Sequence, residues 1–244
     1  MSPKARKTKK ALIVWGGWGG HTPKECAERF APWLESKGFK VTVSDTLDAY
    51  LDKRRMKTYQ VIIPIWTMGT ITREQSQALR DTIAAGCGLA GWHGGMCDSF
   101  RQDVAYQFMT GGQWVAHPGG VVRYTVDNID QKDPITRGLH PFRMKSEQYY
   151  MHTDPGNKVL AYTTFSGRHQ GVTWIRGVKM PIVWTRRWGK GNVFFTSLGH
   201  VNADFNVPEA FEIAKRGIMW AAREPIVPEY TSPGPKRKVA ARKK

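Results

Sequence analysis

The sequence contains little cysteine, few acidic residues and no long apolar run. Its 244 residues include three cysteines, Cys26, Cys87 and Cys97. No two of them form a C-x-x-C pair. An odd and scattered set of cysteines argues against a disulfide framework and against a zinc site built from thiolates. We therefore expect all three thiols to be reduced.

No apolar stretch approaches the roughly 18 residues that a membrane-spanning helix requires. The apolar segment near the basic N-terminus covers only residues 11–15, which is shorter than the apolar region of about 7–15 residues in a secretory signal. These absences predict a cytoplasmic protein that is not inserted in a membrane.

The shortage of acidic residues leaves a net charge of +17, from 37 Lys and Arg against 20 Asp and Glu. Eleven of these surplus charges lie in residues 1–10 and 235–244, where no acidic residue occurs. Segments with like charges and little apolar surface cannot offset the entropy cost of ordering. We predict disordered basic tails at 1–10 and 225–244 and one folded domain over 11–224. The tails would either bind nucleic acid weakly through its phosphates or simply aid solubility.

Short apolar runs alternate with helical patterns in the first 110 residues, which predicts parallel βαβ units. Each expected helix starts at a threonine, Thr22 or Thr72, that has Glu or Gln three residues later and so matches a capping box. The second half is richer in strands, and its Gly-Lys-Gly turn at 189–191 is typical of an antiparallel hairpin. The expected strands are 11–15, 41–43, 59–66, 89–92, 120–127, 158–165, 180–186 and 191–197, followed by a helix at 208–222. The predicted fold class is α/β, a three-layer α/β/α sandwich with a mostly parallel sheet and antiparallel additions in the second half.

Polar residues directly follow several predicted strands. They are His21 after the first strand, residues 67–70 after the third, His93 after the fourth and His200 after the last. Ligands of open α/β sheets bind beyond the carboxyl ends of the strands. Histidine exchanges protons or binds metals near neutral pH. We therefore predict that the three histidines converge in one pocket.

His93 occupies the centre of the frame G-x-H-x-G at residues 91–95. The frame G-x-S-x-G of hydrolases presents a nucleophile on a sharp turn, and class I glutamine amidotransferases have Cys at that position. Histidine does not form the usual acyl-enzyme, and Cys97 is poorly placed to replace the nucleophile. We predict that the turn is kept without the acyl chemistry and that His93 transfers protons. The alternative is a turn histidine that only bonds the backbone.

Residues 146–152 combine an acid, two phenols and a histidine. In an extended segment Glu147 and Tyr149 face one side and Gln148 and Tyr150 the other. Glu147 is a candidate general base or metal ligand, with an ordinary surface strand as the alternative. No metal motif of local spacing occurs, so a divalent ion such as zinc would need distant ligands, namely His21, His93 and His200 with Glu147. Candidates for substrate binding are His21, Trp18, Trp66, Tyr149, Tyr150 and Asn206, with His117 as a further contributor.

Several segments together resemble the ThuA-like (trehalose-utilisation) family. They are ALIVWGGWGGHT (11–22), GLAGWHGG (88–95), SEQYY (146–150), PIVW (181–184), GKGNVFFTSLGH (189–200) and RGIMWAA (216–222). The resemblance implies a flavodoxin-like fold of the class I glutamine amidotransferase-like kind that lacks the amidotransferase Cys. It also implies a link to disaccharide or keto-glycoside metabolism, often beside sugar oxidoreductases. The family's polar positions would correspond to His21, His93, Glu147 and His200.

Three functions remain open at this point. The first is a sugar-active hydrolase, lyase or isomerase in which His93, Glu147 and His200 are catalytic, with or without a metal. An ordinary glycosidase is disfavoured because it needs two facing carboxylates. The second is a non-catalytic sugar-binding or partner subunit, and the third is a nucleic-acid-associated protein that acts through its tails. Expected partners are a small carbohydrate, a sugar oxidoreductase and further copies of the chain in a homo-oligomer.

Overall fold

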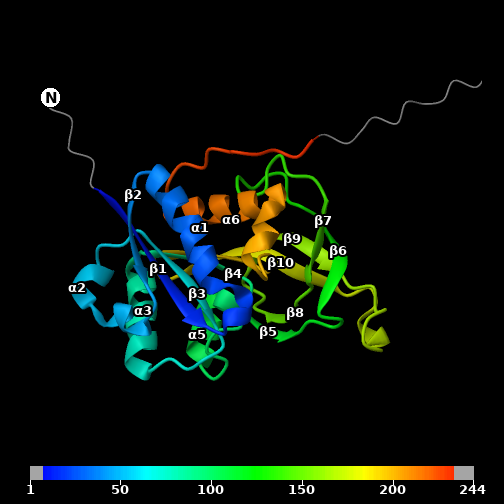
Figure 1. The fold of residues 1–244 in the computed structure, drawn as a ribbon, viewed down its shortest axis with the longest axis horizontal. Helices are drawn as coiled ribbons and strands as arrows, with labels where there is room; N and C mark the ends of the chain where they lie inside the picture. The colour runs from blue at the N-terminus through cyan, green and yellow to red at the C-terminus, as the bar shows by residue number, and fades with distance from the viewer. Residues whose placement is uncertain (1–7, 234–244) are drawn as a thin grey trace, which may run out of the picture.

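In the computed structural model, residues 8–233 are described. Residues 1–7 and 234–244, which are parts of the predicted tails 1–10 and 225–244, lie outside the described residues. One sheet of nine strands runs through the molecule (Figure 1) in the order β2-β1-β3-β4-β11-β10-β9-β6-β7. Its first five strands are mutually parallel: β2 (Phe39–Ser44), β1 (Lys9–Gly17), β3 (Val61–Thr67), β4 (Gly88–Trp92) and β11 (Gly191–Thr196). The other four are antiparallel additions: β10 (Lys179–Trp188), β9 (Lys158–Thr164), β6 (Val121–Asp127) and β7 (Phe142–Glu147).

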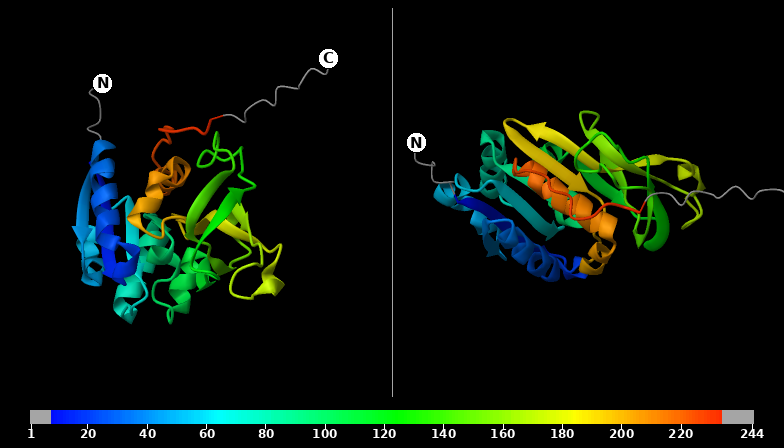
Figure 2. Two further views of the ribbon diagram at one scale, coloured as in Figure 1. Left: turned by 45° about the vertical axis from the view of Figure 1, so that its right-hand side comes forward. Right: turned by 90° about the horizontal axis from the view of Figure 1, so that it is seen from above.

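Helices cover both faces of the sheet because side chains alternate along each strand. In β1, Ala11 and Ile13 join one apolar cluster with α1 (Pro23–Ser36) and α6 (Pro208–Ala221). Leu12 and Val14 join the opposite cluster with α3 (Arg73–Ala85) and α5 (Val104–Thr110). Figure 2 shows α1 and α6 side by side on one face, seen from above. The predicted three-layer α/β/α arrangement is therefore confirmed.

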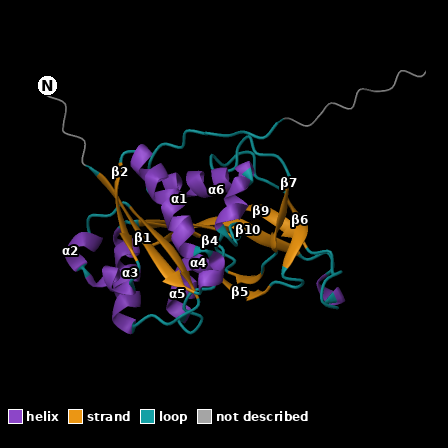
Figure 3. Cartoon of the chain, in the orientation of Figure 1, coloured by secondary structure: helices purple, strands orange, loops and turns teal. Residues whose placement is uncertain are grey.

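The remaining elements are short. They are the helices α2 (Lys53–Met56) and α4 (Gly94–Cys97), a two-stranded sheet of β5 (Gly112–Ala116) and β8 (Tyr150–Thr153), and the 3-10 turns η1 (Gly19–His21), η2 (Leu47–Leu51), η3 (Thr173–Ile175) and η4 (Asn202–Asn206). Figure 3 shows the strands of the second half that it labels β6, β7, β9 and β10 together on the right-hand side of the molecule. Every predicted strand is present, whereas β5, β7 and β8 were not predicted, because their apolar alternation is short and interrupted by polar residues. Within 8–233, no helix has the length and apolarity that crossing a bilayer requires.

The two predicted capping boxes have different outcomes. Thr72 accepts a hydrogen bond from the backbone of Gln75, and the Gln75 side chain bonds back, so this box is present. Thr22 has a φ of +47° and its side chain does not cap α1. Its Oγ1 instead accepts a hydrogen bond of 2.7 Å from the backbone N of Asn202. A tertiary contact thus replaces the local cap and ties the start of α1 to η4.

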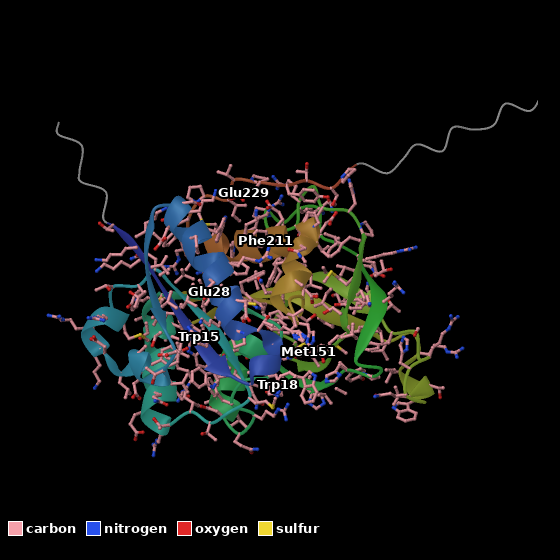
Figure 4. All side chains as sticks on the ribbon, in the orientation of Figure 1. Trp15, Trp18, Glu28, Met151, Phe211 and Glu229 are labelled. Carbon is pink, nitrogen blue, oxygen red and sulfur yellow. The ribbon has the colours of Figure 1, made fainter. Side chains whose placement is uncertain are left out.

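The C-terminal segment 225–233 packs against helices, although we expected it to belong to a disordered tail. Buried Arg216 of α6 donates to the carbonyl of Tyr230 at 2.6 Å. The Glu229 carboxylate pairs with Lys37, directly after α1, at 2.6 Å and with Lys215 of α6 at 2.5 Å. Figure 4 labels Glu229 at the top of the molecule, by α1 and α6. The packed part of the chain therefore reaches residue 233 rather than ending at 224, because buried and half-buried cations need a carboxylate partner.

Replacing Glu229 with Gln should lower the melting temperature at pH 7. Burial acts to raise the pKa of Glu229, but hydrogen bonds from Lys215 and Lys37 outweigh it and lower the pKa from 4.5 to about 2. A depressed folded-state pKa means that the stabilisation is present above pH 4.5 and is lost as the pH falls toward 2. Thermal melts followed by circular dichroism should show the difference between E229Q and wild type shrinking over that range.

The matched control is Glu35→Gln, since Glu35 is an exposed glutamate of α1. The melting temperature of this variant should equal that of the wild type at pH 7 and throughout the range from pH 4.5 toward pH 2. Equal melting temperatures of E229Q and wild type at pH 7 would contradict the assigned role of Glu229.

Candidate functional site

Four polar side chains from separate parts of the chain meet at the carboxyl edge of the parallel strands. His21 ends η1 just after β1, His93 follows β4 and His200 follows β11, while Glu147 is the last residue of β7. One donor atom from each of the four lies within 4.8 Å of the other three. The strand-to-loop transitions of a parallel sheet all occur at one edge, which explains why histidines far apart in sequence become neighbours.

The carboxylate of Glu147 lies among the three imidazoles. Its Oε2 is 3.1 Å from His200 Nδ1, 3.5 Å from His93 Nε2 and 3.8 Å from His21 Nε2. The histidine rings meet at centroid distances of 4.8 to 5.2 Å. Neither ring nitrogen of His93 has a hydrogen-bond partner among the described residues. The cluster therefore holds buried nitrogen donors that face one shared point.

The backbone permits this close approach at two positions. A Cβ on Gly94 would lie 2.5 Å from the His21 ring, so only glycine leaves room for that imidazole. His93 has a φ of +47°, a region that non-glycine residues rarely adopt and that costs about 1–3 kcal/mol. The sharp turn predicted for the G-x-H-x-G frame is thus present. A hydrogen bond of 2.8 Å between His21 Nδ1 and Thr67 Oγ1 leaves the other ring nitrogen, Nε2, facing Glu147.

Burial and neighbouring groups keep His93 neutral and Glu147 ionised. Burial, together with the nearby His21 and His200, lowers the pKa of His93 well below its ordinary value, so this imidazole is neutral. Burial acts to raise the pKa of Glu147, but bonding by His200 and His21 outweighs it and holds the pKa well below its usual range. Neutral imidazole and ionised carboxylate are the forms that bind a metal.

The open side of the cluster is lined by aromatic groups. Trp18 is 48% exposed and meets the His21 ring edge-on at 4.8 Å. Figure 4 labels it at the lower end of β1. His117, whose side chain is 37% exposed, places Nε2 3.7 Å from Glu147 Oε1. Buried Tyr149 packs its ring 3.8 Å from the His93 ring. Glu147 and Tyr149 therefore face the same side, as the extended pattern predicts.

Three of the predicted binding residues are not brought to the cluster. Trp66 packs over Gly16, because β3 alternates and Thr67 is the residue that faces His21. The Tyr150 ring lies 5.5 Å from the Phe165 ring, on the opposite side from Tyr149. Asn206 is exposed and accepts a hydrogen bond from the Arg29 guanidinium at 2.9 Å. Position after a strand does not by itself say on which side a side chain lies.

Other residues of the site are not among the predicted site residues, although Thr67 belongs to the polar segment 67–70 that follows the third predicted strand. Thr67 bonds His21, and the Trp114 ring lies 5.5 Å from that of His117. Asp204 accepts hydrogen bonds from Ser146 Oγ and from the backbone of His200. Asp204 lies in the polar loop after His200, but no pattern in the sequence connects it to Ser146, which is 58 residues away.

The donor set contains the residue types that could hold a divalent ion, with all four ligand atoms within 4.8 Å of one another. Zinc bonds of about 2.0–2.1 Å in tetrahedral geometry place neighbouring ligand atoms roughly 3.3–3.4 Å apart. The three distances from Glu147 Oε2, between 3.1 and 3.8 Å, lie around that value. Three imidazole nitrogens and one carboxylate oxygen are ligands that zinc and related ions accept.

Comparison with known proteins agrees with this architecture. A ThuA-like protein of Parabacteroides merdae has a TM-score of 0.70 at 18% identity, over 91% of this chain and 94% of that one. A ThuA-like protein of Bacteroides uniformis has a TM-score of 0.69 at 18% identity, over 90% and 95%. A β-galactosidase of Bacillus circulans reaches 0.54 at 12% identity, over 90% of this chain and 31% of that one.

At these identities the similarity concerns the fold alone. Among the curated proteins, none matches the chain. The family model of ThuA, described as trehalose utilisation, matches residues 10–221. Since this match spans most of the sequence, the chain belongs to the ThuA family.

Proposed function

We propose that this protein is a metal-dependent enzyme that acts on a disaccharide or a keto-glycoside. The observation that carries the proposal is the set of three imidazoles and one carboxylate, His21, His93, His200 and Glu147, whose donor atoms all lie within 4.8 Å of one another. The unpartnered ring nitrogens of His93 support it, because buried polar atoms are normally hydrogen-bonded. The family's description as trehalose utilisation points to a carbohydrate-related role.

The composition of the cluster favours chemistry at a carbonyl or hydroxyl group over ordinary glycoside hydrolysis. Glycosidases use two carboxyl groups about 5–10 Å apart, one on each side of the scissile bond. Among the described residues, the cluster contains one carboxylate, Glu147. A bound divalent ion would act as a Lewis acid toward a substrate oxygen. Hydrolysis by elimination and isomerisation of a keto-glycoside share a first step, removal of a proton from the carbon next to the carbonyl.

The residues of this chain would divide the work by their position. The rings of His21, His93 and His200 lie within 3.8 Å of Glu147 Oε2 and would hold the ion through their ring nitrogens. Glu147 Oε1 and His117 Nε2 lie 3.7 Å apart on the open side, within reach of a substrate proton. Half-exposed Trp18 would offer an apolar face to a sugar ring. A keto-glycoside substrate requires an oxidation step beforehand, so we propose a sugar oxidoreductase as the supplier.

The purified protein should contain about one divalent ion per chain, measured by elemental mass spectrometry. His93→Ala and His200→Ala should each lose most of this metal, because each substitution removes one of four ligands. His152→Ala, at an exposed position of β8, is the matched control and should keep the metal. Absence of metal from the wild type, even after incubation with zinc, would contradict the metal-dependent mechanism.

His93→Ala should lower kcat/KM for a 3-keto-glycoside by at least about a hundredfold, in line with the loss of an acid–base or metal-binding group. Product formation followed by chromatography is the measurement, with His152→Ala again as the control. If the wild type yields no product while calorimetry shows sugar binding, the protein is a non-catalytic sugar-binding subunit. Equal turnover by H93A and wild type would remove His93 from the mechanism.

Thr67→Val should weaken zinc binding roughly tenfold or more, as the loss of an outer hydrogen bond to a ligating histidine commonly does. Valine keeps the shape of threonine but cannot accept the bond from His21 Nδ1, so the ring loses its fixed orientation. Zinc affinity is measured by competition with a chelating dye. Thr70→Val, on the exposed loop after β3, should bind zinc like the wild type.

A further inference from the structure

One buried carboxylate oxygen links the two segments that carry Glu147 and His200. Asp204 belongs to η4 and is 8% exposed. Its Oδ2 accepts a hydrogen bond of 2.5 Å from Ser146 Oγ and another of 3.0 Å from the backbone N of His200. Ser146 immediately precedes Glu147 on β7. Asp204 therefore bonds the residue before Glu147 and the backbone of His200, and Glu147 and His200 are two of the proposed metal ligands.

The hydrogen bonds of Asp204 connect the ends of β7 and β11, whose separation the pairing of neighbouring strands does not fix. Between β11 and β7 lie three strands, β10, β9 and β6. At a spacing of about 4.8 Å, strands four places apart in a flat sheet are about 19 Å apart. Glu147 Oε2 nevertheless lies 3.1 Å from His200 Nδ1. The second half of the sheet must therefore curl so that the end of β7 returns over the end of β11.

The end of β7 has little other support within the sheet. It is an edge strand, and β6 is its only neighbour in the sheet formed by the described residues. The β6–β7 ladder sets the register of Glu147 opposite Val121 but does not set its position relative to β11. A hydrogen bond between a hydroxyl and a buried carboxylate is short and strong, and it leaves Ser146 in one orientation. The contact between Ser146 and Asp204 is thus placed where the sheet lacks a constraint.

We propose that Asp204 is a positioning residue, which holds Glu147 and His200 at metal-binding separation through Ser146 and the His200 backbone. The inference rests on the proposed metal-dependent function and identifies how this chain assembles that site before an ion binds. The physical basis of this role is preorganisation. Ligands that surrounding hydrogen bonds already hold in place bind a metal without losing further conformational freedom.

Zinc affinity, measured by chelator competition on the full chain, separates positioning from simple stability. Asp204→Ala should weaken zinc binding by about tenfold to a hundredfold, and Ser146→Ala should do so to a smaller extent. Asp204→Asn should bind nearly as the wild type does, because its amide oxygen can accept both hydrogen bonds. Rescue by asparagine together with loss in alanine is the expected result.

Asp133→Ala is the matched control. Asp133 is a buried aspartate that accepts a backbone hydrogen bond from Ile135 and pairs with Lys158 at 2.7 Å, outside the cluster. The substitution D133A should lower the melting temperature of the protein while leaving the zinc affinity of the folded protein unchanged. If D133A and D204A weaken zinc binding equally, Asp204 has only a general structural role and the proposal is overturned.

A second readout needs no metal. Long-range ¹H–¹⁵N spectra of the histidine rings in metal-free protein should show a shifted or broadened His200 signal in D204A, and wild-type signals in D204N and D133A. A wild type that fails to bind zinc would end the proposed function, while these spectra would still decide whether Asp204 positions the ring. Unchanged His200 signals in D204A, or failure of D204N to restore them, would overturn the inference.

Discussion

A buried carboxylate held among three imidazoles is the interaction on which the rest of this structure depends. Removing an ionised carboxylate from water costs several kcal/mol unless partners replace the lost hydration. Glu147 finds those partners in His200 and His21, which bond its carboxylate and lie on two other segments of the chain, while His93 lies 3.5 Å away on a third. Each segment must be held in register for the charge to be tolerated. The requirement explains why His21 is hydrogen-bonded with Thr67 and why the His200 backbone N donates to Asp204.

The two halves of the sheet contribute differently to this arrangement. The parallel half brings three histidines to one edge because every strand there ends on the same side. The antiparallel half returns across that edge and supplies Glu147 from its last strand. The small β5–β8 sheet adjoins this region, and Tyr149, just before β8, packs against His93. An α/β scaffold with antiparallel additions therefore encloses a polar site that the parallel strands alone would leave open.

The turn at His93 resembles a nucleophile elbow in its backbone geometry, but histidine stands where an elbow has serine or cysteine. A positive φ places the imidazole at the top of β4, where related folds present a nucleophile. The nearby Cys97 is fully buried, and burial raises the pKa of its thiol well above the ordinary value. A thiol in that state is a poor nucleophile. This buried thiol supports our proposal of binding and proton transfer, rather than acyl transfer, at the site.

The sequence by itself determined the fold class, eight of the strands, the cap at Thr72 and the four candidate residues of the cluster. Local periodicity and polar residues near strand ends carry these features. Tertiary structure alone decided that Thr22 bonds η4, that 225–233 packs on α1 and α6, and that Trp66, Tyr150 and Asn206 lie away from the cluster. It also decided the contact between Ser146 and Asp204. The physical reason is that side-chain direction and the curl of the sheet arise from contacts between distant segments, which local patterns do not encode.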